Sequence, residues 1–306
     1  MLSTPVTESI LAGMRATILG GDRRKLEIAR KLLAEGCEVR YFGGPSELSE
    51  IIEAPMSASS AEAVKGAKVV FCPMPRIGEN GDLYAPYSSS PVRLDPNEMD
   101  EMESGSIVIM GWTPPEMHAA AETRGIHIEE IGQEEECAIF NSIPTAEGAL
   151  WCAIEHTDET VHNSNVLIGG FGRVGETTAH TFLAMGARVF VAARRLAPLA
   201  RAQEMGCSVF GWDEIDGHWD EMQIVVNTVP QEFFNRVRLS RAKSDCVYID
   251  LVSPPGSADR TAADELGMHV HWLRGQAATA PRFTGRNQWN LSRQRILAHF
   301  QKGDIS

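Results

Sequence analysis

The chain has 306 residues, of which 43% are hydrophobic, and its 41 acidic and 28 basic residues give a net charge of -13. A chain of this length usually folds as two domains, because a single hydrophobic core stops growing at roughly 250–300 residues. The acidic excess argues against a protein that coats nucleic acid or binds an anionic membrane surface. An anionic ligand would therefore need a local cluster of basic residues.

The cysteines and the start of the chain bear on the cell compartment. The six cysteines stand singly, and no spacing of His, Cys and carboxylate residues resembles a metal site. The N-terminus lacks the pattern of a signal peptide, and no window has the ~18 to 20 apolar residues of a membrane span. We therefore expect a soluble cytoplasmic protein with reduced thiols, no metal and no membrane partner.

The first half of the chain alternates strand and helix patterns. Short apolar runs predict strands near 16–19, 39–42, 68–71 and 106–110, and the apolar spacing over 25–35 predicts a helix. This alternation indicates a parallel sheet covered by helices on both faces, and so the α/β class.

Pro144 marks the expected boundary between the domains. Proline suits the first turn of a helix, where its missing N–H needs no partner, so the sequence predicts a connector helix over 145–161. The last helical pattern is expected to return to the first domain. The predicted domains are therefore 1–144 with 286–306, and 145–285.

The second half opens with a glycine motif after an apolar strand. The motif has the G-x-G-x-x-G pattern of Rossmann dinucleotide sites: a tight turn, room for the pyrophosphate, and close packing of helix on strand. Backbone N–H groups at the helix start would bind the pyrophosphate. The predicted cofactor-binding residues of this turn are Gly170, Phe171, Gly172, Arg173, Val174 and Gly175.

The choice between NAD and NADP depends on the end of the second strand of this domain. An NAD enzyme usually places a carboxylate there for the ribose 2′-OH, whereas this sequence has Arg194 and Arg195. Two guanidinium groups suit a 2′-phosphate, with solvated charges at a helix start as the alternative interpretation. We therefore predict NADP(H) as the cofactor.

Two later strand ends are expected to face the same cofactor. Thr228, Val229 and Pro230 follow one predicted strand, and Asp250 and Ser253 lie at the end of the next. Ligands of open α/β sheets bind at the carboxyl ends of the strands. Simple turn chemistry would explain the prolines at these strand ends equally well.

The segment 140–148, F-N-S-I-P-T-A-E-G, resembles the family of dipicolinate synthase A subunits, as do 153–158, 18–23 and 249–251. The resemblance spans most of the chain and implies two Rossmann-like, doubly wound parallel-sheet domains similar to those of D-2-hydroxyacid dehydrogenases. The N-terminal domain and last helix would form the substrate domain, with the active site between domains.

The resemblance also implies a function. The family oxidises dihydrodipicolinate to dipicolinate (pyridine-2,6-dicarboxylate) in the mother cell during sporulation, together with a flavoprotein-like B subunit. We also expect a homo-oligomer. This chain departs from the family pattern over 274–286 and has Pro254 where the family has a basic residue. Two alternatives therefore stay open: an NADP-dependent dehydrogenase acting on another carboxylate, and a nucleotide-binding subunit without catalysis of its own.

The remaining candidates concern the substrate and the proton. Two carboxylates need cations, for which Arg76, Arg274 and Arg282 are the candidates, although each could be an ordinary surface arginine. Ser142 and Thr145, at the expected helix start, could contact a carboxylate or merely cap the helix. Glu147 and His156 are candidates for moving the proton, against structural roles for both. The predicted catalytic residues are Ser142, Thr145, Glu147 and His156.

Overall fold

In the computed structural model the chain forms two compact units, residues 1–138 with 280–306 (unit 1) and residues 139–279 (unit 2). The structure describes residues 9–75, 77–78 and 81–303. Over these residues, no helix combines the length and the apolar character needed to cross a membrane. The chain passes between units at Ala138 and Ala280, whereas the predicted boundaries are 144 and 286.

Unit 1 contains a five-stranded parallel sheet in the order β2-β1-β3-β4-β5. The chain starts in the middle of the sheet, adds β2 on one side and then crosses to β3 on the other. The strands are β1 (Arg15–Leu19), β2 (Glu38–Phe42), β3 (Val69–Phe71), β4 (Ile107–Met110) and β5 (His127–Glu130). The central strands β3 and β4 are buried on both faces, so their sequences are continuous apolar runs, whereas β1 is buried from Ala16 onward and includes the buried Thr17.

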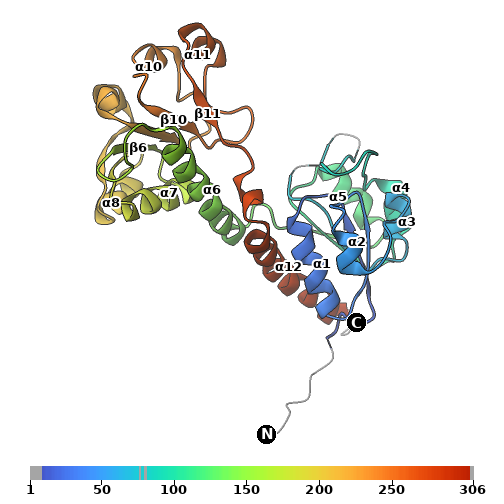
Figure 1. The fold of residues 1–306 in the computed structure, drawn as a ribbon. Coiled ribbons are helices and arrows are strands. Elements are labelled where there is room, and N and C mark those ends of the chain that lie inside the picture. The colour runs from blue at the N-terminus through green and yellow to red at the C-terminus, as the bar shows by residue number, and fades with distance from the viewer. Residues whose placement is uncertain (1–8, 76, 79–80, 304–306) are drawn as a thin grey trace. The chain divides into compact units, whose positions relative to one another are not determined.

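Helices cover both faces of this sheet. Figure 1 shows α12, at the end of the chain, lying side by side with α1, and the two helices are in contact. Trp289 and Ile296 of α12 are buried with Leu26 of α1 in one core cluster, as the predicted return of the last helix requires. The helices are α1 (Arg24–Ala34), α2 (Leu48–Ile52), α3 (Ser60–Val64), α4 (Pro96–Asp100), α5 (Pro115–Glu122) and α12 (Pro281–Gly303).

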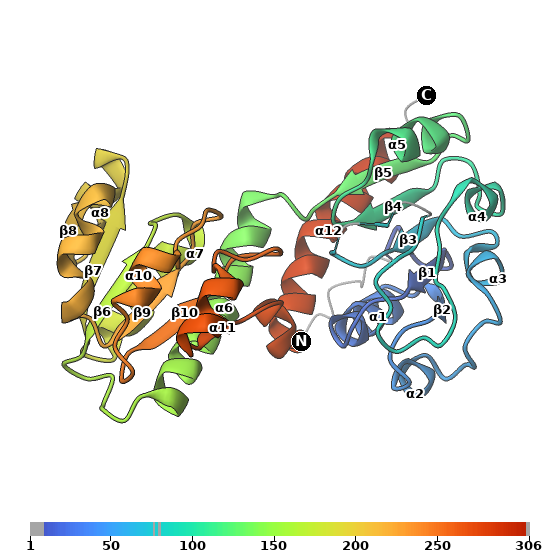
Figure 2. The ribbon, with the colours of Figure 1, turned by 90° about the horizontal axis from the view of Figure 1, so that it is seen from above.

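Unit 2 contains a six-stranded parallel sheet in the order β11-β10-β9-β6-β7-β8. This is the strand order of dinucleotide-binding domains, in which the chain reverses direction between β6 and β9 and opens a crevice there. Figure 2 shows β6 to β10 of this sheet side by side, and β11 pairs with β10. They are β6 (Asn165–Gly169), β7 (Arg188–Ala193), β8 (Ser208–Gly211), β9 (Ile224–Asn227), β10 (Val247–Asp250) and β11 (Val270–Trp272).

The helices of unit 2 complete its two outer layers. Buried residues of α6 and α7, among them Ala149 and Phe182, pack in one core cluster with the central strands. The helices are α6 (Glu135–His156), α7 (Arg173–Ala184), α8 (Leu196–Glu204), α9 (Ile215–His218), α10 (Arg236–Ser240) and α11 (Arg260–Leu266), with short 3-10 turns η1 (Trp212–Glu214), η2 (Trp219–Glu221) and η3 (Gln276–Thr279).

The predicted connector helix over 145–161 is wrong in both of its ends. Helix α6 begins at Glu135 and ends at His156, with Pro144 inside it. The proline removes one backbone donor from the helix, and separately the hydroxyls of Ser142 and Thr145 donate to the carbonyls of Ile139 and Asn141. Acidic residues in the first turn also favour the earlier start, because they face the positive end of the helix dipole.

Candidate dinucleotide and substrate sites

The turn between β6 and α7 gives each of its three glycines a separate role. Gly170 has a φ of +92°, which residues with a side chain rarely adopt. A Cβ atom on Gly175 would lie 2.3 Å from the carbonyl oxygen of Gly170, so only glycine allows α7 to pack this closely. A Cβ atom on Gly172 would have none of the described atoms within 4 Å, so this glycine faces open space. The turn therefore has room for a pyrophosphate against its backbone.

The start of α7 is suited to an anion. Gly172 is the N-cap of this helix, and none of the described side chains caps the helix start. The backbone N–H groups of a first turn and the helix dipole together favour a negative charge at this end. Of the residues between the glycines, Phe171 is buried in the core, Arg173 is exposed and Val174 is half-buried.

Arg194 and Arg195 follow β7 and line a pocket of about 240 Å³ beside the glycine turn. The guanidinium carbon of Arg194 lies 5.4 Å from the centroid of the Trp212 ring, and this arginine also donates a hydrogen bond to Gln231. An arginine held by an aromatic face keeps its donors in a defined place. The pocket is lined by Gly170, Phe171, Gly172, Ala193, Arg194, Arg195, Pro198, Trp212 and Val229.

The strand end after β9 is fixed by a buried amide. The side chain of Asn227 accepts a hydrogen bond from the Val229 N–H at 3.1 Å and donates to Ser257 Oγ at 2.8 Å. The hydroxyl of Thr228 donates to a carbonyl at the end of β6 at 2.9 Å. Val229 lines the pocket beside the glycine turn, and Pro230 is exposed. The structure thus brings Thr228 and Val229 to the glycine turn.

The carboxylate of Asp250 is occupied by its own loop. One of its oxygens accepts from the Val252 N–H at 3.1 Å and the other from the Ser257 N–H at 2.6 Å. Asp250 is buried, and these two bonds fix the loop that follows β10. Ser253, in the same loop, is exposed. The two backbone bonds give Asp250 a structural role whether or not a cofactor is bound.

Ser142 and Thr145 lie inside α6 rather than at a helix start. Ser142 is buried, and its hydroxyl lies 2.7 Å from the carbonyl oxygen of Ile139 and 2.6 Å from Oγ1 of Thr177 on α7. The hydroxyl of Thr145 donates to the carbonyl of Asn141 at 2.8 Å. The prediction that free backbone N–H groups at Ser142 and Thr145 could bind a carboxylate is therefore wrong, because both residues lie in the interior of α6.

Glu147 and His156 both lie exposed on α6, but only His156 is part of a cluster. Its ring stacks on that of His271 with centroids 4.0 Å apart, and His269 packs edge-on against His271 at 4.3 Å. Burial, together with the charges of the two neighbouring rings, lowers the pKa of His271 to about 4. Cys152 lies close to the same pair. This cluster was not predicted, although Cys152 and His156 are one helical turn apart on α6.

The three candidate arginines for the substrate have different environments. Arg76 lies outside the described residues. The guanidinium of Arg274 lies 4.7 Å from the ring centroid of Trp272, and Arg260 lies 4.1 Å from the same centroid. Arg274 is thus part of an arginine–tryptophan stack at the end of β11.

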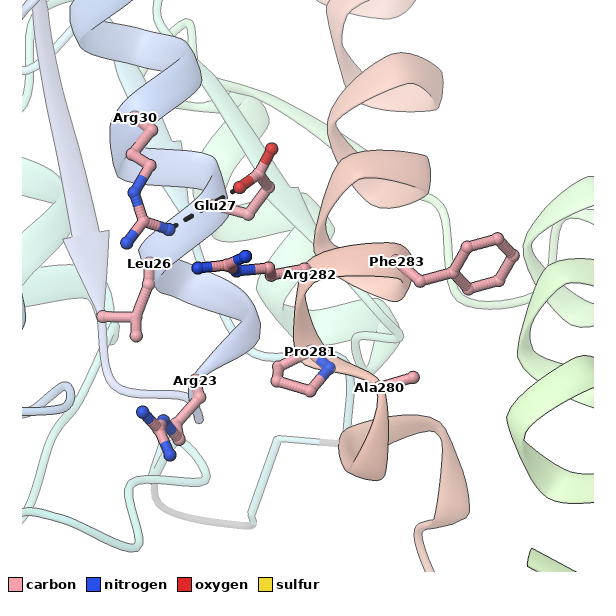
Figure 3. A pocket seen from close by; sticks show the side chains of 8 residues that line it. All are labelled: Arg23, Leu26, Glu27, Arg30, Ala280, Pro281, Arg282 and Phe283. Carbon is pink, nitrogen blue, oxygen red and sulfur yellow. Dashed lines mark ion pairs between the residues drawn. The ribbon is translucent and has the colours of Figure 1, made fainter. Parts of the chain in front are cut away.

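Arg282 lines a pocket of about 430 Å³ in unit 1, between the first turns of α1 and α12. Figure 3 shows its side chain extending toward α1, where Arg30 and Glu27 form an ion pair, while Phe283 points away from α1. Arg23 also lines the pocket and pairs with Glu47 at 3.1 Å. The pocket therefore contains three guanidinium groups and one carboxylate, which favours an anionic ligand.

A buried lysine in unit 1 was not predicted. Lys25 is 3% exposed, and its ammonium group donates to the carbonyl of Cys72, the residue after β3. Burial lowers the pKa of Lys25 to about 8. The residue thus connects α1 to the point where the sheet order reverses between β1 and β3. The sequence around Lys25 has an ordinary helix pattern, which gives no indication that this lysine is buried.

Comparisons with known proteins agree over nearly the whole chain. Residues 15–131 match the N-terminal domain of the dipicolinate synthase A subunit, whereas 145–251 match the NAD binding domain of D-isomer specific 2-hydroxyacid dehydrogenases. The dipicolinate synthase A subunit of Bacillus subtilis (strain 168) is 31% identical over 294 residues, which are 95% of this chain and 98% of the relative. The chain belongs to this family of dipicolinate synthase A subunits.

Solved structures support the same assignment. The A chain of Bacillus subtilis dipicolinate synthase superposes with a TM-score of 0.84 at 29% identity, covering 97% of this chain and 100% of that one. The A subunit of the Bacillus halodurans synthase gives a TM-score of 0.83 at 28% identity, covering 94% of this chain and 99% of that one. A Sinorhizobium meliloti transhydrogenase, 16% identical, shares the fold with a TM-score of 0.62, covering 92% of this chain and 95% of that one.

The dehydrogenase-type domain and the residues around its glycine turn fit a nicotinamide dinucleotide. Open space at Gly172 and the uncapped start of α7 suit the pyrophosphate, and the neighbouring pocket ends on two arginines. This family member is therefore an oxidoreductase with a nicotinamide-dinucleotide-binding domain.

Proposed function

We propose that this protein is an NADP-dependent dehydrogenase that oxidises dihydrodipicolinate to dipicolinate. The observation that carries the proposal is the glycine turn with its arginine-lined pocket, in a chain that matches a dipicolinate synthase component over 95% of its length. The reaction removes a hydride and a proton from a dihydropyridine dicarboxylate. The cofactor, when bound, supplies the hydride acceptor. The protein would orient the two reactants and place positive charge near the substrate carboxylates.

The residues of unit 2 would select and orient the cofactor. The N–H groups at the start of α7 would bind the pyrophosphate, and Gly172 would admit it. The guanidinium groups of Arg194 and Arg195 would bind the 2′-phosphate, with the Trp212 ring fixing the plane of Arg194. The resulting preference for NADP(H) over NAD(H) comes from charge, because the described residues that line this pocket include no carboxylate.

The substrate would be bound by cations. Arg282 is the candidate with the strongest support, because its pocket also contains Arg23 and Arg30 and is larger than a pyridine dicarboxylate needs. A carboxylate accepts paired hydrogen bonds from a guanidinium, which fixes its orientation as well as its position. Glu147 and His156 stay the candidates for moving the proton, whereas the hydroxyls of Ser142 and Thr145 already donate to carbonyls.

We further propose that the protein works with a second, flavoprotein-like subunit in the cytoplasm of the sporulating mother cell. The support is the name of its relatives, each of which is designated the A component of a synthase. A homo-oligomer of this chain belongs to the same proposal.

The proposed reaction is tested by turnover. Purified protein is given NADP⁺ and dihydrodipicolinate freshly formed in the cuvette, and NADPH and dipicolinate are both quantified, with and without the second subunit. Equal amounts of NADPH and dipicolinate are expected. Binding of NADPH without turnover, even with the second subunit present, would refute the reaction and favour another carboxylate substrate or a nucleotide-binding role without catalysis.

A further inference from the structure

Three potential metal ligands lie together in unit 2, and none of them belongs to the Gly170–Gly175 turn. One ligand atom from each of Cys152, His156 and His271 lies within 4.8 Å of the other two. Ligands of a tetrahedral zinc ion stand roughly 3.5 Å apart, given bond lengths of about 2.0–2.3 Å. The group therefore needs only a small contraction to surround an ion.

The backbone positions of this cluster are held by regular structure. Cys152 and His156 are four residues apart on α6, so their side chains lie on the same face of the helix. His271 is the central residue of β11 and pairs with Ile249 of β10. Ala149 and Ala153, which flank Cys152 on α6, are fully buried in the core of unit 2. The two elements thus present the three ligands from a rigid framework.

The burial of the three groups differs in a way that suits a bound ion. Cys152 is 1% exposed, His271 is half-buried and His156 is exposed. The buried thiol would therefore bind the ion from the interior of unit 2. The opposite side of the ion would face solvent, near His269, which contacts the ring of His271. Three protein ligands with an open fourth position are common for zinc when water or another ligand completes the site.

We propose that Cys152, His156 and His271 form a binding site for a borderline-soft divalent cation of the zinc class. One thiolate and two imidazoles are the donor set that Zn²⁺ and Co²⁺ prefer over Mg²⁺ or Ca²⁺. Binding replaces the thiol proton with the metal and releases that proton to solvent, without any redox change. The bound ion would tie the last turn of α6 to the edge strand β11.

One local movement is required. The rings of His156 and His271 are stacked, with only 16° between their planes, so their in-plane lone pairs do not converge. Because His156 is exposed at the end of α6, its ring can turn about the Cβ–Cγ bond toward the thiol. The competing interpretation is a stacked, metal-free histidine pair, which predicts no binding at all.

The test is a titration of the untagged, chelator-treated full-length protein with Co²⁺, followed by competition with Zn²⁺. We expect one Co²⁺ per chain, a thiolate-to-cobalt charge-transfer band, and displacement by Zn²⁺. Cys152→Ser should abolish the band, and His156→Asn and His271→Asn should weaken binding by about tenfold or more. Cys207→Ser and His162→Asn, which change a buried thiol and an exposed histidine elsewhere in unit 2, should leave it unchanged.

X-ray absorption at the zinc edge provides a readout that needs no variant. We expect one sulfur and two imidazole nitrogens in the first coordination shell. No binding at a slight excess of metal, a shell without sulfur, or a charge-transfer band that survives in folded Cys152→Ser would each overturn the proposal. Because the readouts are spectroscopic, they do not depend on whether the proposed dehydrogenase reaction is correct.

Discussion

Replacing Arg194 with alanine should convert a preference for NADPH into indifference between NADPH and NADH. The guanidinium lies on the Trp212 ring and lines the pocket beside the glycine turn, so it is held where the phosphate of the ribose is expected. A hydrogen bond to a charged group contributes about 1.5–3 kcal/mol, and 1.4 kcal/mol is a factor of ten. NADPH should therefore bind about 10- to 150-fold more weakly to the variant.

The dissociation constants of both cofactors are measured by fluorescence for the parent protein and for Arg194→Ala. Affinity for NADH should stay within about twofold, because an adenosine diol gains little from a guanidinium. Arg201→Ala is the matched control, since Arg201 lies on α8 in the same unit, exposed and paired with Glu204. A parent protein that binds both cofactors equally, or a variant that loses NADH as strongly as NADPH, would refute the reasoning.

Three other substitutions test the same geometry. Gly175→Ala should weaken binding of either cofactor by on the order of 100-fold and lower the melting temperature, because the added Cβ would lie 2.3 Å from a backbone oxygen; titration and thermal unfolding check this. Arg282→Ala should raise the KM for dihydrodipicolinate by about 10- to 150-fold while leaving NADPH affinity unchanged, and steady-state kinetics check this. Lys25→Met should raise the free energy of unfolding most below about pH 8, where folding buries a charged ammonium group in the parent protein. Because the pKa of Lys25 is lowered in the folded state, the unfolded chain binds more protons than the folded chain between about pH 8 and 10.5. The free energy of unfolding of the parent should therefore rise by about 3 kcal/mol relative to that of the variant across this pH range, and urea unfolding measures it.

The Rossmann-like fold of unit 2 was predictable because its central strands are buried on both faces. β6 and β9 each contain three consecutive buried aliphatic residues, V-L-I in β6 and I-V-V in β9, which give a clear strand signal. The edge strands β5 and β8 were not predicted. Each pairs on one side only and has a single buried residue, as in His127–Glu130, so neither has the apolar signal of a central strand.

The glycine turn was predictable for a related reason, since its roles are fixed by backbone geometry within six residues. The side chains that complete the pocket come from far along the chain: Trp212 and Gln231 meet Arg194 only through the folded sheet. Pro144 misled the prediction of α6 in a different way. A local rule places proline at helix starts, but here the helix continues through the proline, and the buried Ser142 and Ala146 on either side of it show that tertiary packing outweighs the loss of one hydrogen bond.

The two units share a strand–turn–helix start, yet only one of these turns is open to a pyrophosphate. In unit 1 the turn after β1 contains Gly20 and Gly21, as a phosphate-binding turn would. A Cβ atom on Gly21 would lie 2.8 Å from the Lys25 side chain, and the Gly21 N–H already donates to the carbonyl of Tyr84 at 2.8 Å.

The anion position at the start of α1 is likewise taken from within the chain. The carboxylate of Asp22 accepts a hydrogen bond from the Arg24 N–H at 3.1 Å, where a phosphate would bind in a dinucleotide site. In unit 2 no side chain in the described part of the chain caps the corresponding helix start, and Gly172 faces open space. Similar backbones therefore acquire different roles through what fills the turn: a lysine and an aspartate close it in unit 1, and their absence from the Gly170–Gly175 turn leaves it open in unit 2.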